Sequence, residues 1–268
     1  MKAKKVLFIT SEIDPFVAES NRSLMGRKLP QSIQEIGHEI RTFTPKWGTI
    51  NERRNQLHEV IRLSGMNLII NETDHPLIIK VASLPSARMQ IYFIDNDDYF
   101  MKRGIITDKD GREYADNAER AVFYARGVLE TVKKLRWTPD VIHCHGWTAS
   151  LVPLFLKLAY NEEPSFCESK VVVSIAPKEF ELDLGIEEAK SVEFKNVHFD
   201  DIKDICAEQF THTEMMKVAV KYADGVIIES NEVDPSIEEY AKSLNIPVLP
   251  PVGDDFKEAY SEFYDSIM

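Results

Sequence analysis

Short apolar runs alternate with amphipathic segments along this chain, and this alternation limits the folds open to it. The runs Lys5–Thr10 and Lys170–Ile175 are rich in β-branched and aromatic residues, as are strands buried on both faces of a parallel sheet. Between them, Asn117–Leu135 has apolar residues at helical spacing and two lysines in its last turn, where cations suit the helix dipole. The alternation predicts an α/β fold, a Rossmann-like parallel or mixed sheet with helices on both faces.

The same alternation predicts the remaining strands and helices. Further strands are expected at residues 38–45, 76–84, 89–95, 140–144, 225–229 and 246–249, with 76–84 and 89–95 forming a hairpin. Helices are expected at 29–36, 213–222, 235–244 and 255–267, a polar loop at 11–27, and irregular structure at 178–204. Because no repeat or interdomain linker is visible, residues 1–268 are expected to form a single domain.

Composition narrows the choice of partners and compartment. The chain has 32 Lys and Arg against 44 Asp and Glu, a net charge of −12, which argues against nucleic acid or an anionic membrane surface as partner. No apolar run approaches the roughly 18 residues of a membrane span, and the N-terminus does not resemble a signal peptide. Three scattered cysteines do not form a disulfide framework, so a reducing, cytoplasmic location is expected.

Residues 139–148 are the strongest candidate site. They read as a strand, a tight turn and the start of a helix, which places His145 at the carboxyl end of a strand, where open parallel sheets bind ligands. Strand alternation puts His143 and His145 on one face and Cys144 on the other. Three interpretations remain open: one histidine in the core and the other lining a cleft, a substrate contact by His145, or a metal pair. The metal pair ranks last because zinc needs three or four ligands and no further pair is visible; no metal or cofactor is predicted.

Six blocks of the chain occur in an order that is typical of one enzyme family. They are KVLFITSE (residues 5–12), GHEIR (37–41), PKWGTI (45–50), DNAER (116–120), PDVIHCHGW (139–147) and YAD (222–224). With them, the chain resembles the N-terminal half of bacterial glycogen synthases and plant starch synthases, which are two-domain GT-B glucosyltransferases. The resemblance implies retaining transfer of glucose from ADP- or UDP-glucose to an α-1,4-glucan. It also implies that His145 is catalytic. Asn117, Arg120 and Trp147 are further candidates for substrate binding, with a structural role as the alternative for each.

The chain departs from the family at functional positions. Residues 18–21, Ala-Glu-Ser-Asn, replace a Lys-Thr-Gly-Gly loop that serves the nucleotide sugar, which removes a cation and puts the carboxylate of Glu19 nearby. Arg22 is the nearest cation that could take the place of that lysine. Gly146 replaces an acidic residue, and Ala176-Pro177 replaces a His-Asn pair.

The family's C-terminal nucleotide-sugar domain is also absent from the 268 residues. We therefore expect no activity from this chain alone, and activity only if a partner chain supplies that domain. The alternatives are a non-catalytic glucan-binding or synthase-partner module, and a protein that binds a different small ligand in the same crevice.

Overall fold

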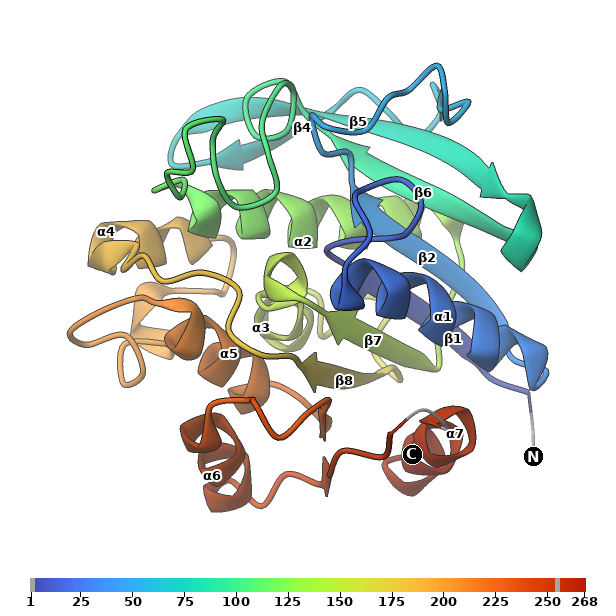
Figure 1. The fold of residues 1–268 in the computed structure, drawn as a ribbon. Coiled ribbons are helices and arrows are strands. Elements are labelled where there is room, and N and C mark those ends of the chain that lie inside the picture. The colour runs from blue at the N-terminus through green and yellow to red at the C-terminus, as the bar shows by residue number, and fades with distance from the viewer. Residues whose placement is uncertain (1–2, 254–255) are drawn as a thin grey trace.

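The central sheet is mixed, with a parallel core and an antiparallel edge (Figure 1). The computed structural model describes residues 3–253 and 256–268. Its strands are β1 (Lys5–Thr10), β2 (Glu39–Pro45), β3 (His58–Glu59), β4 (Met66–Ile70), β5 (Thr73–Leu84), β6 (Met89–Asp95), β7 (Val141–His145), β8 (Lys170–Ile175), β9 (Gly225–Ile228) and β10 (Val248–Leu249). They lie in the order β10-β9-β8-β7-β1-β2-β6-β5-β3, and β4 pairs with β5. Strands β10 to β6 are parallel neighbours, whereas β5 pairs antiparallel with β6, β3 and β4.

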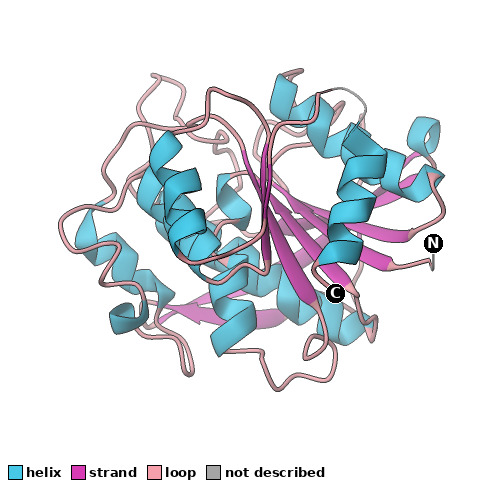
Figure 2. Cartoon of the chain, turned by 90° about the horizontal axis from the view of Figure 1, so that it is seen from below, coloured by secondary structure: helices cyan, strands magenta, loops and turns pink. Residues whose placement is uncertain are grey.

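Helices cover both faces of the sheet, which is seen between them in Figure 2. They are α1 (Asn21–Glu35), α2 (Asn117–Leu135), α3 (Val152–Leu158), α4 (Gly185–Ala189), α5 (His212–Lys221), α6 (Pro235–Ser243) and α7 (Phe256–Ser266). Successive side chains of β1 show the division: Leu7 and Ile9 join a large core with α2, α3 and α5, whereas Val6 and Phe8 join a smaller core with α1 and α7. The fold class and the mixed sheet expected from the sequence are therefore confirmed.

Most of the predicted elements are confirmed. Strands β1 and β8 and helix α2 have the predicted bounds, and the hairpin of β5 and β6 turns at the predicted place. Alternation on β7 is also as predicted, because Cys144 lies in the larger core whereas His143 faces α7.

Three predictions were wrong or incomplete. Helix α1 begins at Asn21 rather than at residue 29, because Ser20 and Ser23 form a reciprocal capping box with bonds of 3.0 and 2.9 Å. The sequence reading also missed the short strands β3 and β4, and it missed α4 inside the stretch expected to be irregular. The last predicted helix is α7 from Phe256, and Asp255 lies outside the described residues.

Helix α7 completes the smaller core and satisfies a buried histidine. Its aromatic side chains pack on Val6, Phe8 and neighbouring strand residues. The Tyr264 hydroxyl lies 2.6 Å from Nδ1 of His143, and the Ser174 hydroxyl lies 2.7 Å from Nε2. Burial lowers the pKa of His143 to about 3, so the ring is neutral at physiological pH. His143 is thus the core histidine of the pair, as the first interpretation required.

Tyr264→Phe is expected to destabilise the fold, because it leaves Nδ1 of His143 without a partner in the core. A buried polar atom that loses its hydrogen bond costs about 1–3 kcal/mol of unfolding free energy. The measurement is urea unfolding followed by circular dichroism. Tyr92→Phe is the matched control, because the Tyr92 hydroxyl makes no hydrogen bond with the described residues. Equal losses in the two variants would contradict the role given to Tyr264.

Candidate functional site at the carboxyl edge of the sheet

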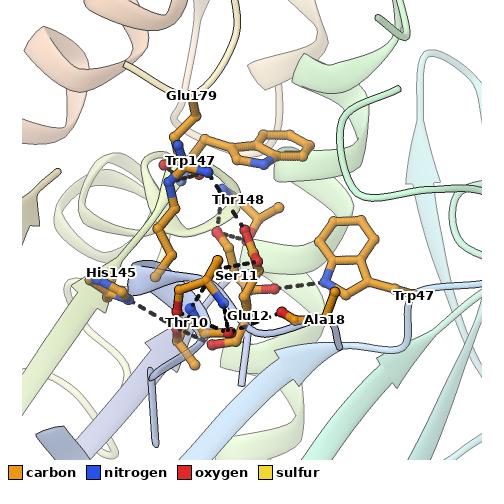
Figure 3. A network of polar contacts seen from close by, with 12 residues as sticks. Thr10, Ser11, Glu12, Ala18, Trp47, His145, Trp147, Thr148 and Glu179 are labelled. Carbon is orange, nitrogen blue, oxygen red and sulfur yellow. Dashed lines mark hydrogen bonds and ion pairs between the residues drawn. The ribbon is translucent and has the colours of Figure 1, made fainter. Parts of the chain in front are cut away.

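The candidate site is built where β1 and β7 end, around Ser11. The Ser11 N–H donates to the carbonyl of His145 at 3.0 Å, which extends the pairing of the two strands by one bond. Its hydroxyl lies 2.8 Å from the hydroxyl of Thr148 and accepts the Thr148 N–H at 3.2 Å. Its carbonyl accepts from Nε1 of Trp47 at 2.7 Å (Figure 3). One residue therefore fixes the turn after β7 and an indole against the centre of the sheet.

Gly146 fits this turn because the turn has no room for a side chain at this position. Its φ is +84° and its ψ is 165°, a backbone region that is essentially restricted to glycine. A Cβ at this position would lie 2.3 Å from Oγ of Ser11. The departure from an acidic residue at position 146 thus has a local structural reason in this chain.

His145 stands at the carboxyl end of β7, as predicted, and both ring nitrogens face protein groups. Only 3% of the residue is exposed. Nδ1 lies 3.1 Å from Oγ1 of Thr10, and Nε2 lies 3.0 Å from Oε1 of Glu229, at ion-pair distance but without hydrogen-bond alignment. Burial alone would lower the pKa of His145, but the carboxylates of Glu229, Glu179 and Glu12 raise it above its ordinary value. Burial likewise would raise the pKa of Glu229, but the imidazole beside it lowers it, so both shifts describe one ion pair.

A second charged group lies beside the first and is centred on Glu179. Its side chain is 1% exposed, and Oε1 accepts the backbone N–H of Trp147 at 2.8 Å (Figure 3). Nε of Arg22 lies 3.5 Å from Oε2, and Nη1 of Arg22 lies 3.9 Å from the carboxylate of Glu12. Burial and the charge of Glu179 raise the pKa of Glu12. Arg22 therefore lies at the candidate site, within 4 Å of two carboxylates.

The other predicted site residues lie in the protein interior. Arg120, Asn117 and Trp147 are fully buried. The Arg120 guanidinium donates to Oδ1 of Asn117 and to the carbonyls of Tyr99, Gly104 and Ile105. It also lies 5.0 Å from the ring centroid of Trp47 and 5.7 Å from that of Trp147, and burial lowers its pKa to about 9. In this arrangement the three residues contact protein, and direct substrate contacts by them remain a prediction, as does catalysis by His145.

The sequence reading missed four members of the site: Glu12, Glu179, Glu229 and His212. Glu229 directly follows β9 and Glu12 follows β1 by two residues, so the rule that selected His145 could have selected both. Glu179 and His212 carried no such signal, because one lies in an irregular loop and the other opens α5. Glu19, the carboxylate expected to face the lost lysine position, is exposed.

A hollow lies away from these charged groups. It measures about 620 Å³ and is lined by Ile69, Asn71, Glu72, Glu187, Glu188, Lys190 and Glu193. Burial and the nearby Glu119 raise the pKa of Glu188 to about 7. Within residues 3–253 and 256–268, no group of three or more His, Cys, Asp or Glu is placed to hold a metal ion. Over the same residues, no helix is long and apolar enough to cross a membrane.

Comparisons with known proteins agree on one family. The model of the starch synthase catalytic domain matches residues 5–243. Glycogen synthase from Chlorobium luteolum is 42% identical over 172 residues, which are 64% of this chain and 35% of that protein. Glycogen synthase from Chlorobaculum parvum is 34% identical over 236 residues, 84% of this chain and 46% of that protein. The chain therefore spans less than half the length of these relatives, and it corresponds to their N-terminal portion.

A solved structure shares the fold. It is the catalytic domain of starch synthase IV from Arabidopsis thaliana bound to ADP and acarbose, with a TM-score of 0.74 over 94% of this chain and 52% of that one. The two sequences are 14% identical in the aligned part, so this likeness concerns the fold alone.

Gly146→Ala is expected to destabilise the protein more than Gly111→Ala. Both glycines have positive φ, +84° and +80°, but a Cβ at position 111 meets nothing within 4 Å. The difference between the two variants therefore reports the clash with Ser11 together with the strain of a backbone region that only glycine adopts readily, and we expect it to exceed about 1 kcal/mol of unfolding free energy. Denaturant unfolding of both variants measures it. Equal destabilisation would show that the contact with Ser11 relaxes freely.

The pKa of His145 is expected to fall in Glu229→Gln, because the closest carboxylate that raises it loses its charge. NMR titration of the imidazole tests this, with Glu232→Gln, an exposed carboxylate on the same loop, as the control. The raised pKa gives a contribution to stability that is full below about pH 6.5 and is lost as pH rises through the folded-state pKa. An unchanged pKa in Glu229→Gln would contradict the ion pair.

Proposed function

Because the chain belongs to the starch synthase catalytic domain family, we propose that it works in α-1,4-glucan biosynthesis, in glucosyl transfer from ADP- or UDP-glucose to glucan. The observation that carries the proposal is His145, which stands at the carboxyl end of β7 in a fold shared with a synthase bound to ADP and acarbose. Acarbose is an oligosaccharide, and the carboxylates of Glu12, Glu179 and Glu229 near His145 are groups that accept hydrogen bonds from sugar hydroxyls. His145 is the proposed catalytic residue, and Asn117, Arg120 and Trp147 the proposed residues behind the glucan subsite.

The charges around His145 favour binding of the neutral glucan over binding of the nucleotide. Glu12, Glu179 and Glu229 outnumber Arg22 and a protonated His145, and each of the two cations already lies within 4 Å of a carboxylate. A diphosphate would add charges of the same sign, and two like charges about 4 Å apart repel by roughly 4 kcal/mol at the effective dielectric of a protein surface. We therefore propose that this domain contacts the neutral glucan, and that cations from a second domain or a partner chain neutralise the donor diphosphate.

A second candidate function is a non-catalytic glucan-binding or synthase-partner module. The engagement of both nitrogens of His145 favours it, because a histidine held by Thr10 and Glu229 has no nitrogen directed at a substrate. In either case we propose a single cytoplasmic domain over residues 1–268, without a nucleic-acid or membrane partner.

Isothermal titration with maltoheptaose, ADP-glucose and ADP in turn tests the proposal. We expect maltoheptaose to bind, and His145→Ala to weaken binding at least tenfold, while ADP-glucose and ADP give no heat. His58→Ala is the matched control, because His58 is exposed on a short edge strand. Binding of ADP-glucose without maltoheptaose would refute the glucan side of the proposal. Glucosyl transfer by this chain alone, measured as incorporation of labelled glucose, would exclude the non-catalytic module.

A further inference from the structure

Three nitrogen groups from distant parts of the chain lie around the carboxylate of Glu179. Oε1 accepts the Trp147 N–H at 2.8 Å and lies 3.7 Å from Nε2 of His212, and Oε2 lies 3.5 Å from Nε of Arg22. Trp147 lies in the turn after β7, Arg22 in the first turn of α1, and His212 at the start of α5. The side chain at their meeting point is 1% exposed.

His212 shows that this grouping is more than a surface ion pair. Only 2% of the residue is exposed, and Nε2 has no hydrogen-bond partner among the described residues. Phe180 packs edge-on against the imidazole, with ring centroids 5.3 Å apart, and so fixes its direction. A buried imidazole nitrogen therefore faces Glu179 without a hydrogen bond to it.

The donor set is of the kind that binds oxyanions. A guanidinium, a backbone N–H and an imidazole are the groups that recur around phosphate and carboxylate, and charge-assisted bonds to them are the stronger ones. Glu179 reaches this point from residues 176–184, a stretch without strand or α-helix until α4 begins at Gly185. The occupant thus belongs to a loop, whereas the donors belong to the turns and helices around the sheet.

We propose that Arg22, the Trp147 N–H and His212 form an oxyanion-binding site that the chain's own Glu179 carboxylate occupies. The natural chain therefore excludes phosphate and diphosphate groups from this point, and removal of the carboxylate opens it to them. The inference is independent of glucan binding, because it concerns only the donors around Glu179.

Glu179→Ala, titrated with inorganic pyrophosphate by calorimetry, tests the site. We expect at least tenfold tighter binding of pyrophosphate than by the natural chain, and we expect the double variant Arg22→Ala, Glu179→Ala to lose this gain. Glu181→Ala is the matched control, because it removes the same charge two residues away, where the side chain is 77% exposed. An equal gain in pyrophosphate affinity in Glu181→Ala would show that the effect comes from net charge alone, and it would overturn the proposal. Pyrophosphate binding by the natural chain as tight as by Glu179→Ala would overturn it too.

Glu179→Gln keeps the test decisive if the alanine variant does not unfold cooperatively. Glutamine has the same shape and can still accept the Trp147 N–H, but it no longer neutralises Arg22, so we expect at least a threefold gain in pyrophosphate affinity. A folded glutamine variant without any gain would refute the site. Maltoheptaose titrated into the natural chain separates the two proposals. No glucan binding by the natural chain, with gained pyrophosphate binding in the Glu179 variants, contradicts only the proposed function. Glucan binding by the natural chain, without the gain in pyrophosphate binding, contradicts only the oxyanion site.

Discussion

The arrangement of the candidate site depends on Ser11, the first residue beyond the central strand. Its N–H and hydroxyl hold the turn after β7, its carbonyl holds Trp47, and all of these bonds are buried. Trp47, fixed by the carbonyl, packs 6.1 Å from Trp147 between ring centroids, and Arg120 lies over both rings. Contacts therefore connect the tight turn after β7, through Trp147 and Trp47, to Arg120 and to the loop whose carbonyls accept hydrogen bonds from Arg120. A buried polar atom without a hydrogen bond costs free energy of folding, so this network favours one arrangement of these side chains.

Periodicity predicted the parts of the fold that are buried along their whole length. The strands β1 and β8 and the helix α2 carry their apolar pattern from end to end, and their bounds agree with the sequence reading. The start of α1 was not predicted, because its first two turns contain few apolar residues. The cap at Ser20 determines where this helix begins. Serine, glutamate and asparagine before a helix look like loop residues until the spacing of Ser20 and Ser23 is considered.

The site was predictable only where it follows the strands. His145 could be selected because parallel strands present their carboxyl ends at one edge, and Glu229 obeys the same rule one strand beyond β8. Glu179 could not be selected, since its place is set by Phe180, which packs against Trp147 and His212. That packing joins the residues after β8, the turn after β7 and the start of α5, and no local pattern in the sequence encodes it.

The charged groups at the carboxyl edge of the sheet lie close to groups of opposite charge. Buried ions are costly to desolvate, and removing one partner leaves an uncompensated charge that typically costs about 3–5 kcal/mol. Here Arg22 lies between Glu12 and Glu179, and His145 lies against Glu229. A further anion at this point would have to displace a carboxylate from its cation, and this electrostatic cost underlies the proposed preference for a neutral glucan over a diphosphate.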